Sequence, residues 1–225
     1  MLKRFQFKRR NDGFSPLHLL FWWDCVAALT RITIRILWGL RVRGLHHVPA
    51  QGPFLVVANH QSHFDPMVLG SIMADRAPRS LARRSLIEGN GPAGWLIGTA
   101  YGSIPVDRGK DDPGGMRAMF SEMKAGRGIL IYPEGQRFND GTVHQFKRGV
   151  WLLIKRGKVP VIPVGISGSG AAWPPGASRP VLGPKITVTF GAPVDPAVLL
   201  DAGEADALGM LHAKVSALVE QSAAR

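Results

Sequence analysis

The stretch FLVVANHQSHFDP, residues 54–66, decides how the fold of this chain is first interpreted. Its apolar, β-branched beginning predicts a buried strand over 53–58. The Asp65-Pro66 pair at its end predicts a helix over 66–74, because aspartate is a favoured N-cap and proline a favoured first helical residue. Two histidines and a serine lie between the two elements. The order strand, polar turn, helix is typical of an α/β domain.

The remainder of the chain repeats this alternation. Further strands are predicted at 101–106, 128–133, 159–166 and 185–191, and further helices at 93–100, 113–125, 145–157 and from 196 onward. Asp112-Pro113 and Asp195-Pro196 start two of these helices in the same way. The Pro- and Gly-rich segment 168–180 predicts a surface loop. We therefore expect an α/β fold with a mixed, largely parallel sheet flanked by helices.

The amino-acid composition limits the size of the core, the kinds of molecule that this protein would bind, and the use of cysteine. The chain has 225 residues, of which 45% are hydrophobic, enough to bury the core of one large domain or two small ones. Lys and Arg number 28 against 16 Asp and Glu, for a net charge of +12. This balance indicates a polyanionic partner, which would be nucleic acid, an anionic membrane surface or a phosphorylated substrate. Cys25 is the only cysteine, so an intramolecular disulfide and a cysteine-rich zinc site are both excluded.

The first part of the chain is both basic and apolar. Residues 1–43 contain nine basic and two acidic side chains, and we expect them to form a separate N-terminal segment before an α/β domain over 44–225. A spanning helix needs about 20 mostly apolar residues, and Asp24, Arg31 and Arg35 interrupt the apolar run too often for that. No signal-peptide cleavage pattern follows.

The spacing of Asp24, Arg31 and Arg35 places all three on one narrow stripe of a helix. A wide apolar face, basic ends and the paired Trp22 and Trp23 suit the membrane interface. We therefore predict an amphipathic helix that associates with anionic lipid. The alternative is an ordinary helix that packs on the domain and turns its two arginines toward solvent.

His60 and Asp65 have the spacing HxxxxD, which is short enough to occur by chance. One interpretation is a helix cap beside incidental histidines. The other is a catalytic pair, because the carboxyl ends of strands are common ligand sites and a tight turn would bring Asp65 back to His60. Asp65 would then orient the imidazole as a general base. A metal site that used His63 as well would lack further ligands, and we interpret His63 as incidental.

The chain offers no nucleophile of its own. GISGSG at 165–170 lacks the spacing of a GxSxG elbow, and Cys25 has no histidine near it in sequence. The attacking hydroxyl is therefore expected to belong to a substrate, which favours a transferase over a covalent hydrolase. GNGPAG at 89–94 matches a dinucleotide pattern but follows no convincing strand, so we predict no cofactor and no metal.

Two more predicted strands end in charged residues. GSIPVDRGK, residues 102–110, presents Arg108, and ILIYPEGQRF, residues 129–138, presents Glu134 and Arg137. Arginine binds phosphate oxygens in a bidentate way, so these arginines are candidate phosphate ligands. The alternative without a function is a surface ion pair at Arg108 and a solvated turn at Glu134 and Arg137. Gly135 permits an unusual φ or a close backbone approach. Three strand ends that all deliver polar groups are a stronger signal than any one of them.

With these residues in view, the chain resembles the glycerolipid acyltransferase family typified by 1-acylglycerol-3-phosphate acyltransferase. NHQSHFD is similar to the family's NHxSxxD motif, GSIPVDRG to the second motif, YPEGQR to the third, which is usually FPEGTR, and VPVIPVGI to the fourth. The resemblance covers residues 42–195, and the four motifs follow one another in the family's order. Gln136 replaces the usual threonine, and Pro105 stands where an aromatic residue is common.

The resemblance implies roles for these residues. His60 is the base that Asp65 orients, and Arg108 and Arg137 hold a phosphate with help from Glu134, Gly135 and Lys147. The implied reaction moves an acyl group from acyl-CoA or acyl carrier protein to the hydroxyl of 1-acylglycerol 3-phosphate, giving phosphatidic acid.

The same resemblance implies a location and leaves alternatives open. The protein is expected at the cytoplasmic face of the cell membrane, in contact with membrane lipid and without a nucleic-acid partner. Another acceptor, such as glycerol 3-phosphate, another lysophospholipid or a lyso-aminolipid, remains an alternative. A non-enzymatic basic protein that binds lipid or nucleic acid is the competing class, although no zinc-finger spacing or aromatic RNA-binding motif accompanies the charge.

Overall fold

The computed structural model describes residues 25–88, 91, 103–107, 113–138 and 140–224 of the chain. Its strands are β1 (Arg41–Arg43), β2 (Phe54–Ala58), β3 (Arg79–Arg83), β4 (Ile104–Val106), β5 (Gly128–Ile131), β6 (Val161–Ser167) and β7 (Thr187–Phe190). Its helices are α2 (Ala27–Trp38), α3 (Phe64–Ile72), α4 (Arg84–Glu88), α6 (Pro113–Lys124), α7 (Gly149–Gly157), α8 (Ser169–Ala172) and α9 (Pro196–Ala223). Two short 3₁₀ turns, η4 (Leu45–His47) and η5 (Ala74–Arg76), complete the described elements.

The strands form one sheet in the order β1-β7-β6-β2-β5-β3-β4. Only the β6–β7 pairing is antiparallel among the described strands, and the other pairings are parallel. The predicted mixed, largely parallel sheet is therefore confirmed. The strands β2, β3, β4, β5 and β6 all run in the same direction, so their carboxyl ends lie at one edge of the sheet. Polar residues that directly follow these strands are therefore expected at that edge.

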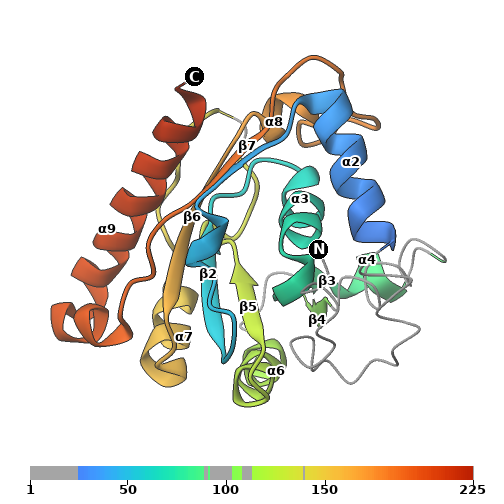
Figure 1. The fold of residues 1–225 in the computed structure, drawn as a ribbon. Helices are drawn as coiled ribbons and strands as arrows, with labels where there is room; N and C mark the ends of the chain where they lie inside the picture. Colours follow the sequence, from blue (N-terminus) through green and yellow to red (C-terminus); the bar gives the residue numbers. More distant parts are fainter. Residues whose placement is uncertain (1–24, 89–90, 92–102, 108–112, 139, 225) are drawn as a thin grey trace.

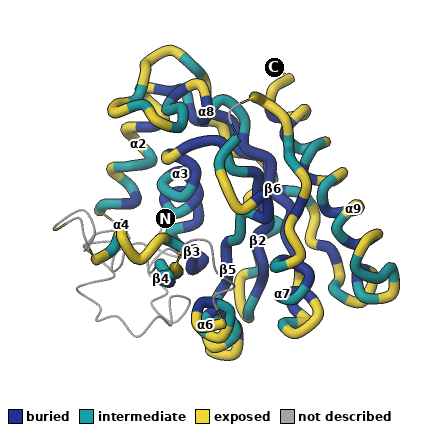
Figure 2. Tube along the Cα trace, turned by 180° about the vertical axis from the view of Figure 1, so that it is seen from behind, coloured by how far each residue is buried: buried dark blue, intermediate teal, exposed yellow. Residues whose placement is uncertain are grey.

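Helices cover both faces of this sheet (Figure 1). The alternation of side chains along β2 divides the core in two, since Phe54, Val56 and Ala58 pack toward α2 and α3, whereas Leu55 and Val57 pack toward α6, α7 and α9. Every residue of β2 is buried, and the buried parts of the chain concentrate in the central strands and α3 (Figure 2). The end of β2 is consequently anchored in the core on both faces of the sheet, which suits it to hold a site.

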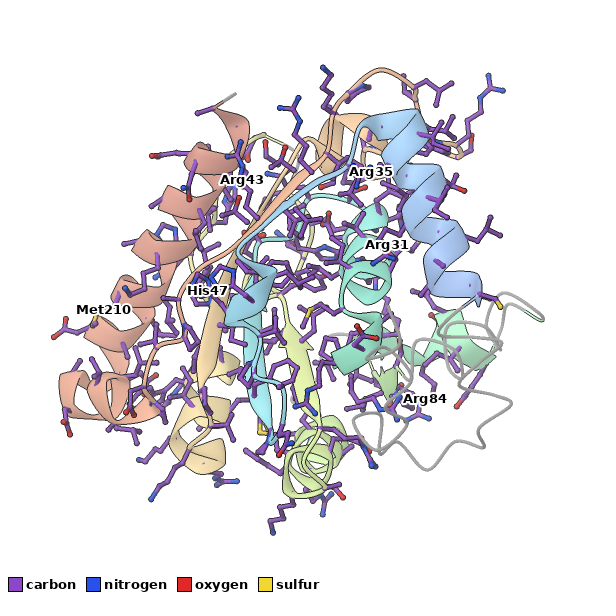
Figure 3. The ribbon with its side chains drawn as sticks, viewed as in Figure 1. Arg31, Arg35, Arg43, His47, Arg84 and Met210 are labelled. Atoms are coloured by element: carbon purple, nitrogen blue, oxygen red, sulfur yellow. The ribbon has the colours of Figure 1, made fainter. Side chains whose placement is uncertain are left out.

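The N-terminal segment contributes to this domain more than the sequence indicated. Residues 41–43, which we assigned to that segment, form β1 and pair with β7. The helix α2 packs on α3 through Ile34 and Trp38. Arg43 projects toward α9 and donates to the backbone oxygen of Gln221 at 3.0 Å (Figure 3). The domain therefore begins before residue 44, because an edge strand needs few apolar residues and gives little sequence signal.

The outward side of α2 is apolar. Leu29, Ile32 and Ile36 are 67%, 52% and 74% exposed, and Arg31 and Arg35 lie along the side of the helix nearer to α3 (Figure 3). The alternative of a packed helix is thus right about the packing, and Arg35 is exposed as it expected, whereas Arg31 is half-buried. The exposed apolar residues are the part that this alternative did not predict. None of the helices in the described residues combines the length and apolar character that crossing a bilayer requires.

The prediction of a surface loop over 168–180 is wrong for its first part. Ser169–Ala172 form the short helix α8, and Ala172 is fully buried. Trp173 then packs edge-on against Phe64, with 5.1 Å between the ring centroids. Small residues and prolines concealed this core contact, because they carry no hydrophobic periodicity. The predicted helix at 93–100 and the beginning of the predicted strand at 101–106 lie outside the described residues.

Candidate active site

His60 and Asp65 form a hydrogen-bonded pair directly after β2. His60 Nδ1 lies 2.8 Å from Asp65 Oδ2. The Asp65 side chain is fully buried, whereas 19% of the His60 side chain is exposed. A buried carboxylate accepts a hydrogen bond from Nδ1–H, so the other ring nitrogen, Nε2, is the one available to accept a proton. This is the geometry expected of an oriented general base.

Asp65 is held by the turn that precedes it. The backbone N–H groups of Gln61 and Ser62 donate to Asp65 Oδ2 at 2.7 and 2.8 Å. The prediction that Asp65 caps a helix beginning at Pro66 is wrong, because α3 begins at Phe64 and Asp65 lies within its first turn. Hydrogen bonding to three donors leaves the carboxylate few orientations, so it holds the imidazole firmly.

The other two Asp-Pro pairs have different outcomes. Asp195 is the N-cap of α9, and its side chain accepts from the backbone N–H of Ala197 at 2.8 Å. Asp112 lies outside the described residues. At α3, Ser62 supplies the local hydroxyl instead, since Ser62 Oγ accepts from the Phe64 N–H at 3.1 Å and donates to the Trp173 carbonyl at 2.7 Å. Ser62 therefore frees Asp65 to face the histidine.

The turn after β5 supplies a second set of contacts to His60. The Tyr132 ring stacks on the imidazole with centroids 4.0 Å apart and planes 15° apart. Glu134 Oε2 accepts from the backbone N–H of His60 at 3.3 Å, and the His60 carbonyl accepts from the Phe138 N–H at 2.9 Å. The first and third motifs therefore meet at one point, although more than 70 residues separate them in sequence.

Burial changes the titration of these side chains. Desolvation raises the pKa of Glu134 to about 7, against the lowering effect of hydrogen bonds from the backbone N–H groups of His60 and His144. Burial, with the nearby Asp65 carboxylate, holds the pKa of Tyr132 well above its usual 10. The pKa of His63 is lowered, mainly by burial and to a smaller extent by the charge of Arg137. The centroid of the His63 ring lies 5.4 Å from that of the Trp173 ring.

Gly135 and Lys147 lie against each other beside this turn. Gly135 has a φ of +73°, a conformation that favours glycine. A Cβ at this position would come within 2.7 Å of Lys147 Nζ, and the Lys147 N–H donates to the Pro133 carbonyl at 2.8 Å. Glycine therefore permits a lysine to cross the turn at close range, which places a cation beside the third motif.

The predicted site residues are thus largely brought together. His60, Asp65 and Glu134 are linked by hydrogen bonds, Gly135 and Lys147 touch each other, and Arg137 is close enough to lower the pKa of His63. Arg108, the predicted phosphate ligand of the second motif, lies outside the described residues.

Sequence reasoning missed Tyr132 and Asn59. Asn59 Nδ2 donates to the Ile166 carbonyl at 2.9 Å and Asn59 Oδ1 accepts from the Ile166 N–H at 2.8 Å, which fastens the end of β2 to β6. An asparagine that directly follows an apolar strand was the available signal. Tyr132 was concealed because an aromatic residue at a strand end is usually interpreted as core.

A pocket of about 780 Å³ lies away from this pair. It is at the amino ends of β2, β5 and β6, the opposite edge of the sheet, and Phe120, Met123 and Arg156 are among its lining residues. The candidate site is therefore defined by the polar contacts around His60 rather than by this pocket. Within the described part of the chain, no group of three or more histidine, cysteine or acidic residues is arranged to hold a metal ion.

Known proteins match both the sequence and the fold of this domain. The sequence model of the acyltransferase family matches residues 39–167, a range that contains His60, Asp65 and the turn after β5. This chain belongs to the acyltransferase family. The acyltransferase match covers more than half of the chain, and it includes the strand ends that carry the polar residues described above.

Named relatives agree with this assignment. The acyltransferase chain is 32% identical over 150 residues to 1-acyl-sn-glycerol-3-phosphate acyltransferase alpha of Mus musculus, which covers 63% of this chain and 50% of that protein. It is 24% identical over 144 residues to 1-acyl-sn-glycerol-3-phosphate acyltransferase of Bacillus subtilis, and this alignment covers 64% of this chain and 70% of that protein. The chain thus spans about half the length of the mammalian relatives that it matches.

A solved structure has the same fold. The crystal structure of the 1-acyl-sn-glycerophosphate (LPA) acyltransferase PlsC from Thermotoga maritima aligns with a TM-score of 0.79 at 24% identity, over 96% of this chain and 86% of that one. At this identity the likeness concerns the architecture alone. The α/β arrangement of this acyltransferase-family chain is therefore shared by a known member along nearly its whole length.

Proposed function

We propose that this protein transfers a fatty acyl group from acyl-CoA or acyl carrier protein to the free hydroxyl of 1-acylglycerol 3-phosphate, giving phosphatidic acid. The observation that carries the proposal is the His60–Asp65 pair, in which Nδ1 is bonded at 2.8 Å to a fully buried carboxylate. The names of the relatives, which are 1-acyl-sn-glycerol-3-phosphate acyltransferases, support the choice of acceptor.

In the proposed reaction His60 Nε2 removes the hydroxyl proton of the acceptor as its oxygen attacks the thioester carbonyl carbon. Asp65 stabilises the imidazolium that results. The tetrahedral intermediate then collapses, the carbon–sulfur bond breaks, and the imidazolium returns its proton to the departing thiolate. Atoms and charges balance without a covalent enzyme intermediate, which agrees with the lack of a GxSxG elbow in the sequence.

Cationic side chains would hold the acceptor's phosphate. We assign this role to Arg137 and Lys147 beside Gly135, and to Arg108 of the second motif. Guanidinium and ammonium groups bind phosphate oxygens strongly, and fixing the phosphate would place the hydroxyl near His60. Positioning of this kind supplies several kcal/mol of barrier reduction in enzymes generally, up to about 7–11 kcal/mol.

The apolar outer side of α2 supports association with a lipid surface. Leu29, Ile32 and Ile36 are more than half exposed, and the segment before them is strongly basic in sequence. We propose that this face enters the interface of an anionic bilayer, on the cytoplasmic side where acyl thioesters are available. The substrate and product would then remain in the membrane.

An acyl-transfer assay tests the proposed activity. Purified protein is incubated with radiolabelled acyl-CoA or acyl carrier protein and a panel of acceptors: 1-acylglycerol 3-phosphate, glycerol 3-phosphate, lysophosphatidylcholine and a lyso-aminolipid. We expect labelled phosphatidic acid from wild type and none from His60→Ala. Transfer only to another acceptor would move the proposal to that lipid, and no transfer to any acceptor would refute it.

Flotation with liposomes tests the membrane part separately. Wild type is expected to float with phosphatidylglycerol vesicles, and a variant with Leu29, Ile32 and Ile36 changed to serine is expected to bind them less. The matched control is Val198→Ser, which alters an apolar residue of α9 that is 50% exposed. Equal flotation of the triple variant and the control would exclude α2 as the lipid contact.

A further inference from the structure

The residues on either side of Pro133 contact His60 at two different places. Tyr132 lies flat against the imidazole at 4.0 Å, and Glu134 Oε2 accepts the backbone N–H of the same residue at 3.3 Å. One turn therefore touches both the ring and the main chain of His60. Asp65 alone does not provide these contacts, since it reaches only the edge of the ring at Nδ1.

The tyrosine ring restricts a motion that the Asp65 bond leaves open. A hydrogen bond at one ring atom fixes the direction of Nδ1, but the imidazole plane is still able to tilt about that bond. A stacked ring with an interplanar angle of 15° opposes the tilt. The hydroxyl is not needed for this: among the described residues Tyr132 Oη is buried without a hydrogen-bond partner.

Glu134 is placed to hold the protein rather than a ligand. Only 2% of the residue is exposed. Its carboxyl group accepts from the backbone N–H of His60, so it ties the turn after β2 to the third motif. The Phe138 N–H strengthens the same link from the other direction by donating to the His60 carbonyl at 2.9 Å.

We propose that Tyr132 and Glu134 are positioning residues, in which the Tyr132 ring fixes the plane of the His60 imidazole and the Glu134 carboxyl fixes its backbone. In this assignment Glu134 does not contact the substrate phosphate, and that task is left to the cationic residues named above. The catalytic consequence rests on the proposed acyl transfer, whereas the geometric part does not depend on the reaction.

Nuclear magnetic resonance tests the geometry without any substrate. In wild type the ring protons of His60 should show an upfield ring-current shift from Tyr132, and the His60 backbone amide should exchange slowly. We expect Tyr132→Phe to keep the ring-current shift and Tyr132→Leu to lose it. Glu134→Ala should accelerate exchange of the His60 amide, and Glu134→Gln, which retains an acceptor oxygen, should restore most of the protection.

Steady-state kinetics test the consequence for the reaction. We expect Tyr132→Leu and Glu134→Ala to lower kcat by about 10- to 100-fold, because misplacing a reacting group by about 1 Å has an effect of that size. The KM for the phosphate-bearing acceptor should change by less than about threefold, as a lost orientation alters the transition state more than binding. Tyr132→Phe and Glu134→Gln should each recover most of the lost kcat.

Each contrary result overturns a defined part of the proposal. A large rise in acceptor KM with kcat retained in Glu134→Ala would make Glu134 a substrate ligand. An unaltered His60 ring-current shift in Tyr132→Leu, or unaltered His60 amide exchange in Glu134→Ala, would remove that residue from positioning. Circular dichroism of every variant and the exposed control Lys155→Gln exclude unfolding as the cause. If wild type transfers no acyl group, the proposed function fails while the resonance measurements still decide the geometry.

Discussion

Two histidine–aspartate pairs lie close together in this molecule and have nearly equal separations. His60 Nδ1 is 2.8 Å from Asp65 Oδ2, and His144 Nε2 is 2.7 Å from Asp140 Oδ2. The two loops are joined through Phe138, whose ring stacks on that of His144 with centroids 3.6 Å apart and whose N–H donates to the His60 carbonyl at 2.9 Å. Distance alone therefore does not distinguish a catalytic pair from an incidental one.

Burial and the choice of ring nitrogen do distinguish the pairs. The Asp65 side chain is fully buried, whereas 51% of the Asp140 side chain is exposed. Asp65 accepts from two backbone N–H groups at the end of a buried strand, but Asp140 is held by its neighbour Thr142 within its own loop. A carboxylate can therefore hold a histidine in one orientation only when the surrounding backbone holds the carboxylate itself in place.

The largest expected effect separates the two histidines. His60→Ala should lower kcat of acyl transfer by about 10²–10⁴-fold, the range that general-base catalysis contributes, because no other described imidazole is bonded to a buried carboxylate. His144→Ala should lower it by less than about tenfold. Initial rates at saturating acceptor measure both, and equal losses in the two variants would end the distinction.

The aspartates give the next comparison. Asp65→Asn keeps the shape of the side chain but favours the wrong histidine tautomer. The loss of kcat should be large but no greater than that of His60→Ala, because Asp65 acts through the histidine. Asp140→Asn, which alters a half-exposed side chain, should leave kcat within about threefold. Thermal unfolding of each variant controls for stability. A mild effect of Asp65→Asn would show that His60 does not need an ionised partner.

Stability should respond to pH in opposite ways at the two loops. Burial raises the pKa of Glu134 from 4.5 to about 7, so the folded protein binds this proton more tightly than the unfolded chain. The free energy of unfolding should therefore fall as pH rises from about 4.5 to about 7. For Asp140, whose hydrogen bond from His144 lowers the pKa from 3.8 to about 2, stability should instead be lost as pH falls from about 4 to about 2.

Urea unfolding across this pH range measures both slopes. Glu134→Gln should remove the component between pH 4.5 and 7, and Asp140→Asn should remove the component at low pH without altering the first one. An identical pH profile in wild type and Glu134→Gln would mean that the buried carboxyl does not titrate as its surroundings indicate.

The smallest expected effect concerns two hydroxyl groups. Ser62→Ala removes bonds to Phe64 and Trp173 in a buried turn, and should lower the free energy of unfolding by about 1–2 kcal/mol. Thr142→Val is the matched change in the exposed loop, where water replaces the lost bonds, and should have a smaller effect. Chemical denaturation measures both. A larger loss from Thr142→Val would reverse the assigned difference in rigidity between the loops.

Much of the fold follows from local patterns, and the departures have physical reasons. The five predicted strands are all present, because each is a β-branched run between turn residues. The strands β1 and β3, with sequences RVR and RSLAR, were missed. Their charged residues break the apolar pattern; Arg79 in β3 is nonetheless buried, since it pairs with Glu122 from α6 at 3.3 Å.

The residues of the candidate site also fall into those that the sequence indicated and those that only the structure shows. The sequence pointed to His60, Asp65 and Glu134 because polar residues followed apolar runs, but it assigned Asp65 to a helix cap that the structure does not show. It also gave Tyr132 no role. A stacked contact between residues 72 positions apart has no local signature, so only the fold reveals it.

The α/β class and the polar residues that follow the strands, His60 and Asp65 among them, could be predicted from the sequence, because strand polarity and side-chain chemistry are local properties. The folded structure is needed to show which of the histidine–aspartate pairs is buried, which ring nitrogen each aspartate contacts, and which described residues surround His60. These depend on how β2 and β5 lie side by side in the sheet. Pairing between distant strands follows from the packing of the whole core, and no short segment of sequence specifies it.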